Sequence, residues 1–416
     1  MFLKVKGVAD NFFQMRYWTS VRKKIESHIQ RYNFTQVDLP LLEHVSLFER
    51  GLGFETDVVS KQMFIIQSKN NDDDAICLRP EATAGTMRAF LENQAQMTTP
   101  ARLFCFGPMF RYERPQKGRC RQFHQMNIEL IGADSILYDA QMIKMLQVLF
   151  AETLSMKNFV LKINFLGQPH DRAAFCKQLV ATLTPLKEKL CSVCQVRLNA
   201  NPLRILDCKS QECQNLAAQA PKLHQFFSQE TQQEWQLLQN TLHDLAVTFV
   251  IDQQLVRGLD YYNKTVFEFV SVDLGAQNTF CGGGRYDGLA TQLGSKQEIP
   301  ALGCAIGMER LLMILEDDQA LLTDPKPALT CIIPMSPAQN QLALHLSDHL
   351  VAHGKTVDVL LDDQKIKNKM KKANDLQATY ALIIGDQEQQ DHTVMLKNMV
   401  TGAQEVVPQL NIEKFL

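Results

Sequence analysis

Side chains suited to binding phosphate gather in one short polar segment of the sequence. This segment, residues 111–121, lies between two strand-like runs and holds five cations: Arg111, Arg114, Lys117, Arg119 and Arg121. Guanidinium groups bind phosphate oxygens in bidentate pairs, and a lysine ammonium adds a point charge. An arginine at a strand end, followed by a basic loop, therefore predicts a phosphate-binding site.

The run after this loop, Gln122–Ile131, carries a second set of polar candidates. Alternation along a strand places Phe123, Gln125, Asn127 and Glu129 on one face and apolar residues on the other. If that polar face is buried, it needs a ligand to satisfy its hydrogen bonds. If it is exposed, solvent satisfies it. The strand alone leaves both interpretations open.

The elements that must position these residues indicate an α+β catalytic domain over residues 1–325. Met15, Trp18, Val21, Ile25 and Ile29 recur at helical spacing. The runs Ala101–Phe110 and Gln122–Ile131 read as an antiparallel hairpin. Residues 167–246 read as a helical insertion. Strand-like sequence then resumes at 265–272 and 300–306. A glycine-rich stretch lies at 282–288, and a helix is predicted over Met308–Leu315.

A second, smaller domain is predicted over residues 328–416. A proline-rich linker is predicted at 324–327. After it, strand-like runs at 329–333, 356–361 and Tyr380–Ile384 alternate with segments of helical pattern. This pattern is typical of a small α/β domain. The basic run Lys365–Lys372 lies within it, and composition alone favours a solvated face over a nucleic-acid contact.

Composition limits the class of protein. The chain has 416 residues, a net charge of −2 and 11 cysteines. An odd number of scattered cysteines, with no apparent export signal, predicts reduced thiols and a cytoplasmic location. No apolar run reaches the roughly 18 residues that a membrane helix needs, so no membrane partner is expected.

The basic loop and the adjoining strand ends have the sequence FRYERPQKGRCRQFHQ. This sequence resembles motif 2 of the class II aminoacyl-tRNA synthetases, in the form typical of the histidyl enzymes. The resemblance implies that Arg111 binds the α-phosphate of ATP. Glu113 would meet the adenine amino group, and Phe123 would stack on adenine. It places Arg114 and Gln116 in a loop that meets the acceptor end of the tRNA.

Four more stretches match the histidyl-tRNA synthetases in order, over about 230 residues. They are LRPEAT at 78–83, VRGLDYY at 256–262, GGGRYDG at 282–288 and GCAIGMER at 303–310, which resembles class II motif 3. By this resemblance Arg257 bridges the histidine carboxylate and the α-phosphate, and Arg310 binds the γ-phosphate. The implied histidine-binding set is Glu81, Ala82, Thr83, Arg111, Gln125, Glu129, Arg257, Tyr261 and Tyr262.

The family activity follows as an expectation. It is the ATP-dependent activation of L-histidine to histidyl-adenylate and its transfer to tRNA(His), with release of diphosphate and AMP. Mg²⁺ is expected with ATP, and a homodimer is expected across the region near Pro40. The implied fold is a class II antiparallel sheet flanked by helices, with the helical insertion and a C-terminal α/β anticodon-binding domain.

Recognition of histidine requires a partner for each ring nitrogen, because a neutral imidazole has one donor and one acceptor. Glu129 is predicted to accept from one nitrogen, and the Tyr262 hydroxyl is predicted to donate to the other. A site of such buried polar partners discriminates against side chains that cannot complete it, by about 10⁴–10⁵ without editing.

Two other classes of protein share parts of this pattern. A regulatory paralogue of the synthetases would be a binding module without activity, but such paralogues lose motif arginines, and this chain keeps Arg111, Arg257 and Arg310. An RNA-binding protein without chemistry would explain the basic C-terminal run, but not the nucleotide and amino-acid motifs. Histidine-dependent exchange of pyrophosphate into ATP separates the enzyme from both.

Four cysteines in the insertion, Cys191, Cys194, Cys208 and Cys213, are spaced C-x₂-C, thirteen residues, then C-x₄-C. The first gap is usual for structural zinc, and the second is longer than usual. Because Pro202 lets the chain turn back, the four thiolates can converge on zinc at about 2.3 Å. The alternative is four unlinked reduced thiols. The resemblance is mostly silent on a metal here, and the catalytic site needs none from cysteine, so the sequence interpretation assigns no protein-bound metal.

Overall fold

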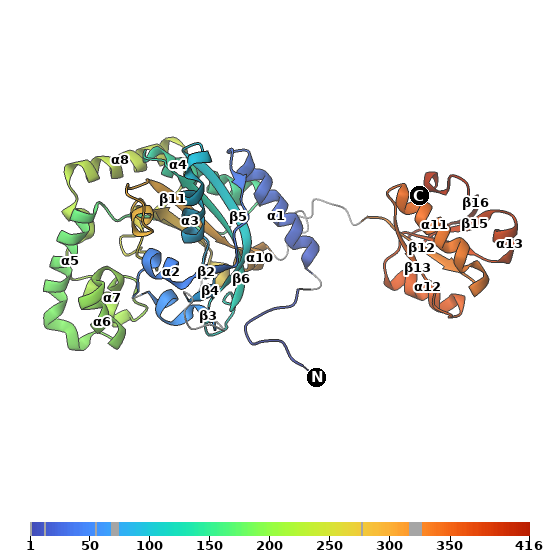
Figure 1. Ribbon diagram of the computed structural model, residues 1–416, viewed down its shortest axis with the longest axis horizontal. Helices are drawn as coiled ribbons and strands as arrows, with labels where there is room; N and C mark the ends of the chain where they lie inside the picture. The colour runs from blue at the N-terminus through green and yellow to red at the C-terminus, as the bar shows by residue number, and fades with distance from the viewer. Residues whose placement is uncertain (1, 12–13, 55, 68–74, 276–277, 316–326) are drawn as a thin grey trace. The chain divides into compact units, whose positions relative to one another are not determined.

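The computed structural model describes residues 2–11, 14–54, 56–67, 75–275, 278–315 and 327–416. The chain divides into two compact units, Met1–Leu321 and Leu322–Leu416 (Figure 1). The predicted domain limit at 325 and most of the predicted linker at 324–327 lie outside the described residues.

An eight-stranded sheet forms the centre of the first unit, in the order β1-β5-β6-β11-β10-β9-β7-β8. Only the two terminal pairs, β1–β5 and β7–β8, are parallel. The strands are β1 (Thr35–Gln36), β5 (Ala101–Phe110), β6 (Gln122–Ile131), β7 (Val160–Phe165), β8 (Val250–Ile251), β9 (Asn263–Val270), β10 (Thr279–Arg285) and β11 (Ala301–Gly307).

The β5–β6 hairpin has the bounds that the sequence predicts, and it pairs in register from Ala101↔Ile131 to Phe110↔Gln122. The face of β6 that carries Asn127 and Glu129 is buried, with both side chains about 1% exposed. The open question about this strand is therefore decided in favour of a buried polar face.

The first four residues of the glycine-rich stretch, 282–285, form the second half of strand β10. A Cβ on Gly283 would lie 2.1 Å from the carbonyl oxygen of Gly303 on β11. A Cβ on Gly282 would lie 2.6 Å from Nη1 of Arg257. Glycine at these positions lets a neighbouring strand and a functional side chain approach the backbone closely.

Helices cover the sheet of the first unit. They are α1 (Met15–Gln30), α2 (Val45–Leu52), α3 (Thr83–Asn93), α4 (Leu137–Val148), α9 (Leu289–Gln292) and α10 (Met308–Leu315). Val21, Ile25 and Ile29 of α1 are buried, as their spacing predicts. A small antiparallel sheet, β2 (Leu42–His44), β4 (Ile76–Leu78) and β3 (Phe64–Ile66), lies beside them.

The insertion is helical, and none of residues 167–246, all of which are described, forms a strand. Its α-helices are α5 (Pro169–Leu183), α6 (Ser192–Ala200), α7 (Gln211–Ala217) and α8 (Gln229–Asp244). Helices α5, α6 and α7 gather at one end of the unit, in green in Figure 1. The predicted fold class, an antiparallel sheet flanked by helices with a helical insertion and an α/β domain, is confirmed.

The second unit is a five-stranded sheet in the order β13-β12-β14-β15-β16, with three helices. Strands β13, β12 and β14 are parallel, and β15 and β16 continue the sheet antiparallel. The elements are β12 (Leu329–Pro334), α11 (Asn340–Ala352), β13 (Thr356–Val359), α12 (Ile366–Asp375), β14 (Tyr380–Ile384), α13 (Asp386–Gln390), β15 (Thr393–Asn398) and β16 (Gln404–Pro408).

The basic run of the second unit is not a uniform solvated face. Lys369 is buried, and its Nζ donates to the carbonyl oxygen of Pro334 at 2.8 Å. Lys372 forms an exposed ion pair with Asp362 at 2.8 Å. The lysine at position 369 therefore satisfies a backbone acceptor, which corrects the interpretation of the whole run as solvated. No described helix of the chain is both long and apolar enough to cross a membrane.

We expect Gly283→Ala to destabilise the first unit, because the new methyl group would overlap the β11 backbone. Overpacking of this kind costs about 1–3 kcal/mol or more. Gly288→Ala in the same motif is the matched control, since nothing lies within 4 Å of its Cβ. It should cost less than about 1 kcal/mol. Thermal unfolding of both variants measures the difference, and equal midpoints would contradict the packing argument.

Candidate functional site

One cavity in the first unit is lined by most of the residues that the sequence singles out. They are Glu81, Thr83, Arg111, Glu113, Phe123, Gln125, Arg257, Tyr261, Tyr262 and Arg310. Four other predicted residues, Ala82, Arg114, Gln116 and Glu129, are not among its lining residues. Strands β6, β11 and β10, which are neighbours in the sheet, contribute residues to its lining.

Arg111 lies just beyond the end of β5, where the hairpin leaves the sheet. Its Nε donates to the carbonyl oxygen of Pro80 at 2.9 Å, and its guanidinium carbon lies 5.4 Å from the centre of the Phe123 ring. Burial lowers the pKa of Arg111 from its ordinary value. It forms no ion pair with a carboxylate of the described residues, so its charge is available to an anionic ligand.

Arg310, on α10, also lines the cavity and is likewise oriented by backbone carbonyl oxygens. Its Nε donates to the carbonyl oxygen of Gly118 at 2.9 Å, and its Nη1 donates to that of Thr279 at 2.7 Å. Burial and the nearby charge of Arg119 lower its pKa. Within the described ranges Arg310 has no ion-pair partner either, so two cations face the cavity without a direct ion pair to a carboxylate.

Arg257 differs, because it is paired. Its Nη1 donates to Oε1 of Glu268 on β9, and Glu268 also accepts from the Thr279 hydroxyl at 2.9 Å. Although burial alone would lower it, the pKa of Arg257 is raised, chiefly by the charge of Glu268. The Nε atom of Arg257 is buried and has no hydrogen-bond partner among the described residues. A ligand acceptor at the cavity would satisfy it.

The loop before α3 supplies a carboxylate to the cavity. Glu81 is buried, and its oxygens accept the backbone N–H groups of Thr83 at 2.7 Å and Ala84 at 2.8 Å. Glu81 thus caps the first turn of α3, and Ala82 is the residue that precedes this helix. Burial raises the pKa of Glu81 from its ordinary value.

Glu129 lies behind Thr83 and is fully enclosed. Its Oε1 accepts from the Thr83 hydroxyl at 2.8 Å, and its Oε2 accepts from the Tyr286 hydroxyl. Burial raises the pKa of Glu129 to about 8, although both hydrogen bonds favour the ionised form. A carboxylate offers about four lone-pair sites, so two bonds leave acceptor capacity for a ligand.

Further polar atoms of β6 are buried without partners. The side-chain oxygens of Gln125 and Asn127 form no hydrogen bond to any described residue. Both residues line the cavity. Because a buried polar atom without a partner costs about 1–3 kcal/mol, such atoms at a cavity wall indicate a missing ligand.

The basic loop itself is solvent-exposed at its tip. Arg114 and Gln116 are exposed, whereas Glu113 faces the cavity and pairs with Arg119 at 2.8 Å. The loop folds back through a bridge between Gln116 and Arg119. The structure therefore separates a cavity side of the loop from an outer side.

Three residues of the site were missed by the sequence interpretation: Glu268, Thr279 and Tyr286. Glu268 and Thr279 surround Arg257, and Tyr286 holds Glu129. Tyr286 stands in the quoted GGGRYDG stretch, so its motif was a signal that it mattered. No pattern in the sequence around Glu268 indicated that it would pair with Arg257.

Comparison with known proteins gives the following matches. Residues 13–311 match the family model of histidyl-tRNA synthetase, and residues 330–416 match that of the anticodon binding domain. A histidine–tRNA ligase from Acinetobacter baumannii (strain AYE) is 40% identical over 424 residues, covering 99% of this chain and 98% of the relative. One from Listeria monocytogenes is 38% identical, covering 95% and 93%.

A solved structure agrees with these matches. Apo histidyl-tRNA synthetase from S. aureus is similar to this chain with a TM-score of 0.82 at 30% identity. The match covers 100% of this chain and 99% of that one.

We expect Glu129→Gln to change the pH dependence of stability in a defined direction. Burial raises the pKa of Glu129 from 4.5 to about 8, so the folded protein holds a proton that the unfolded chain releases. The wild type should therefore lose stability as pH rises from about 4.5 to about 8, at about 1.4 kcal/mol per pH unit at most, and level off above that.

Glutamine at position 129 is neutral at every pH and still has an acceptor and a donor for Thr83 and Tyr286. Thermal midpoints of the variant and the wild type should therefore diverge in favour of the variant between pH 5 and pH 8. A midpoint difference that stays constant over this range would contradict the assigned pKa shift.

Proposed function

The chain belongs to the histidyl-tRNA synthetase family and is a histidine–tRNA ligase, and on that premise we propose which of its residues carry each step. The observation that supports the proposal is the cavity, in which Arg111, Arg257 and Arg310 face buried polar atoms that lack partners. Such a cavity suits a polyanion beside a small polar molecule.

In the first step the histidine carboxylate attacks the α-phosphate of ATP and expels diphosphate. An anion approaches a polyanion here, so catalysis consists mainly of positioning and charge neutralisation. We assign the α-phosphate to Arg111 and the γ-phosphate to Arg310, because both carry charge that no carboxylate neutralises. Phe123, which already lies under Arg111, is assigned to stack on adenine, and Glu113 to meet its amino group.

We assign Arg257 to the reacting centre, where it would bridge the histidine carboxylate and the α-phosphate. Its unpartnered Nε supports this role, since it leaves a donor free while Nη1 is held by Glu268. A cation held by a protein carboxylate keeps its orientation before substrate arrives, which lowers the cost of organising the transition state.

The histidine substrate is assigned to the part of the cavity that is lined by β6 and by the loop before α3. Glu81 and Thr83 take the ammonium group, and Gln125 lies on the adjoining strand. Tyr261 and Tyr262 lie against each other with ring centres 4.5 Å apart, and Tyr262 is assigned to one ring nitrogen. Glu129 is assigned to the other nitrogen, which requires the ring to reach past Thr83.

Mg²⁺ is assigned as a partner of ATP. Glu113 and Glu309 contribute carboxylates to the cavity, and carboxylate oxygen is a ligand type that Mg²⁺ prefers. The donor set therefore fits. When bound, the ion would neutralise charge on the outer phosphates, and Arg310 would hold the γ-phosphate beside it.

In the second step the terminal ribose hydroxyl of the tRNA attacks the adenylate carbonyl, and AMP leaves. The exposed Arg114 and Gln116 are assigned to the acceptor end, because they lie on the outer side of the basic loop. The second unit is assigned to the anticodon of tRNA(His). Residues 1–325 and 328–416 remain the proposed limits of the two domains.

We assign the enzyme to the cytoplasm, where it would supply charged tRNA to translation, and to a homodimer. The region near Pro40 supports the dimer, because Leu41 and Leu42 are exposed there, as are Ile65 and Ile66 of the same small sheet. Sedimentation of the full chain tests this assembly, and a monomer at micromolar concentration would contradict it.

We expect Arg257→Ala to reduce histidine-dependent pyrophosphate exchange by about 10²–10³, since removal of one positioned donor costs about 2.7–4 kcal/mol of transition-state stabilisation. Histidine binding should weaken less. Arg114→Ala is the matched control: exchange should persist, whereas transfer to tRNA(His) should fall. A loss of exchange below tenfold in Arg257→Ala would remove this residue from the reacting centre.

We also expect two exposed lysines of α12, Lys367 and Lys371, to contact tRNA phosphates. Their joint change to glutamine should weaken binding and reduce the slope of log K against log salt by about 1–2. The matched control replaces the exposed Lys157 and Lys296 of the first unit, which alters net charge equally. Equal slopes for the two double variants would make the α12 run an ordinary solvated surface.

A further inference from the structure

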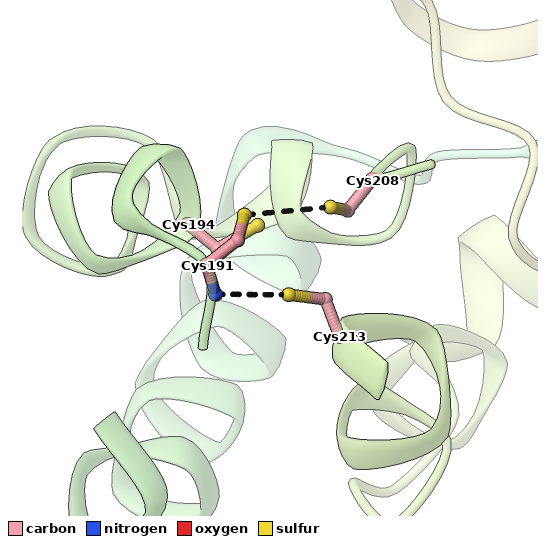
Figure 2. A group of neighbouring side chains, drawn as sticks. All are labelled: Cys191, Cys194, Cys208 and Cys213. Carbon is pink, nitrogen blue, oxygen red and sulfur yellow. Dashed lines mark hydrogen bonds between the residues drawn. The ribbon is translucent and has the colours of Figure 1, made fainter. Parts of the chain in front are cut away.

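The four cysteines of the insertion, which lie apart in the sequence, meet in space. Cys191 and Cys194 belong to the start of α6, Cys208 follows the short helix Pro202–Ile205, and Cys213 lies in the first turn of α7. Figure 2 shows the four side chains pointing toward one another from these separate elements. Convergence from separate elements is what a chelating site requires and what unlinked thiols do not.

The distances fit a metal better than a disulfide. All four sulfurs lie within 4.8 Å of one another, and Sγ of Cys191 and Cys208 are 3.8 Å apart. A tetrahedron with zinc–sulfur distances of about 2.3 Å has sulfur–sulfur edges of about 3.8 Å. A disulfide requires about 2.05 Å, and all four cysteines are free.

The surroundings also suit thiolates bound to a cation. Cys194, Cys208 and Cys213 are buried and Cys191 is partly exposed, so most of the centre is shielded from bulk water. The backbone N–H of Cys191 donates to Sγ of Cys213 at 3.3 Å, and that of Ser210 donates to Sγ of Cys208 at 3.4 Å. Such donors stabilise charge on ligand sulfurs and fix their orientation.

We propose that Cys191, Cys194, Cys208 and Cys213 form a structural zinc site in the insertion. Four thiolate ligands with no open position are typical of structural rather than catalytic zinc, and soft sulfur in tetrahedral geometry selects zinc over magnesium or calcium. This assignment replaces the sequence interpretation, which assigned no protein-bound metal. It does not depend on the residue roles proposed for the cavity.

The ion would have a mechanical role. Helices α6 and α7 have 9 and 7 residues, and helices this short need tertiary restraint. The chain between Cys194 and Cys208 touches the segment that leads to the cavity: Nδ2 of Asn201 donates to Oδ1 of Asp260 at 2.9 Å. Zinc bound at both ends of this chain would hold Asn201 against that segment.

Metal analysis of the full chain tests the proposal. The protein is made without a histidine tag in zinc-supplemented medium and purified without chelator. We expect about one zinc ion per chain in the wild type, and zinc loss with a lowered thermal midpoint in Cys191→Ser/Cys194→Ser. Cys176→Ser, in helix α5 of the same insertion but outside the cluster, is the matched control and should keep its zinc.

A second measurement does not depend on the folding of a variant. Wild-type protein produced with cobalt should show the ligand-field bands of tetrahedral cobalt and intense sulfur-to-cobalt charge transfer, and both are expected to disappear when zinc is added. Less than about a tenth of a zinc ion per chain overturns the proposal. So does iron in place of zinc, a full complement of zinc in the double variant, or cobalt bands without sulfur charge transfer.

Discussion

Positive charge held inside a partly enclosed cavity, on two arginines that form no ion pair with a described carboxylate, is the constraint on which the site depends. A guanidinium paired with a protein carboxylate would have less attraction left for phosphate. Arg111 and Arg310 are instead oriented by backbone carbonyl oxygens, which fix geometry without cancelling the charge. Those carbonyls belong to the segment before α3, to the basic loop and to the start of β10, so three separate parts of the first unit orient the two arginines.

Arg257 lines the same cavity, but a carboxylate holds it in place of backbone carbonyl oxygens. Its partner Glu268 cancels part of its charge, but it leaves the buried Nε without a partner. The three arginines therefore differ in character. Under the proposed assignments, two would present their charge to the phosphates of ATP, and one would present a directed donor where the bond forms.

The amino-acid side of the cavity depends on close approach of backbone. Glu129 occupies space that a side chain at Gly303 would fill, because a Cβ there would lie 1.6 Å from its Oε2. A buried carboxylate in such a place favours its protonated form unless donors surround it. Thr83 and Tyr286 provide two donors. Under the proposed assignment an imidazole N–H would provide a third, which would couple substrate binding to the ionisation of Glu129.

The sequence by itself determined the fold class, the β5–β6 hairpin and most of the cavity residues, because alternation and motif order are local properties of the chain. It did not determine that the first four residues of GGGRYDG lie in strand β10, that Lys369 is buried, or that Glu268 pairs with Arg257. These outcomes depend on which backbone a residue meets across the sheet. For the same reason the spacing of the four cysteines left two interpretations open, and only the packing of α6 and α7 on α5 and on the short helix Pro202–Ile205 brought their sulfurs to metal-binding distance.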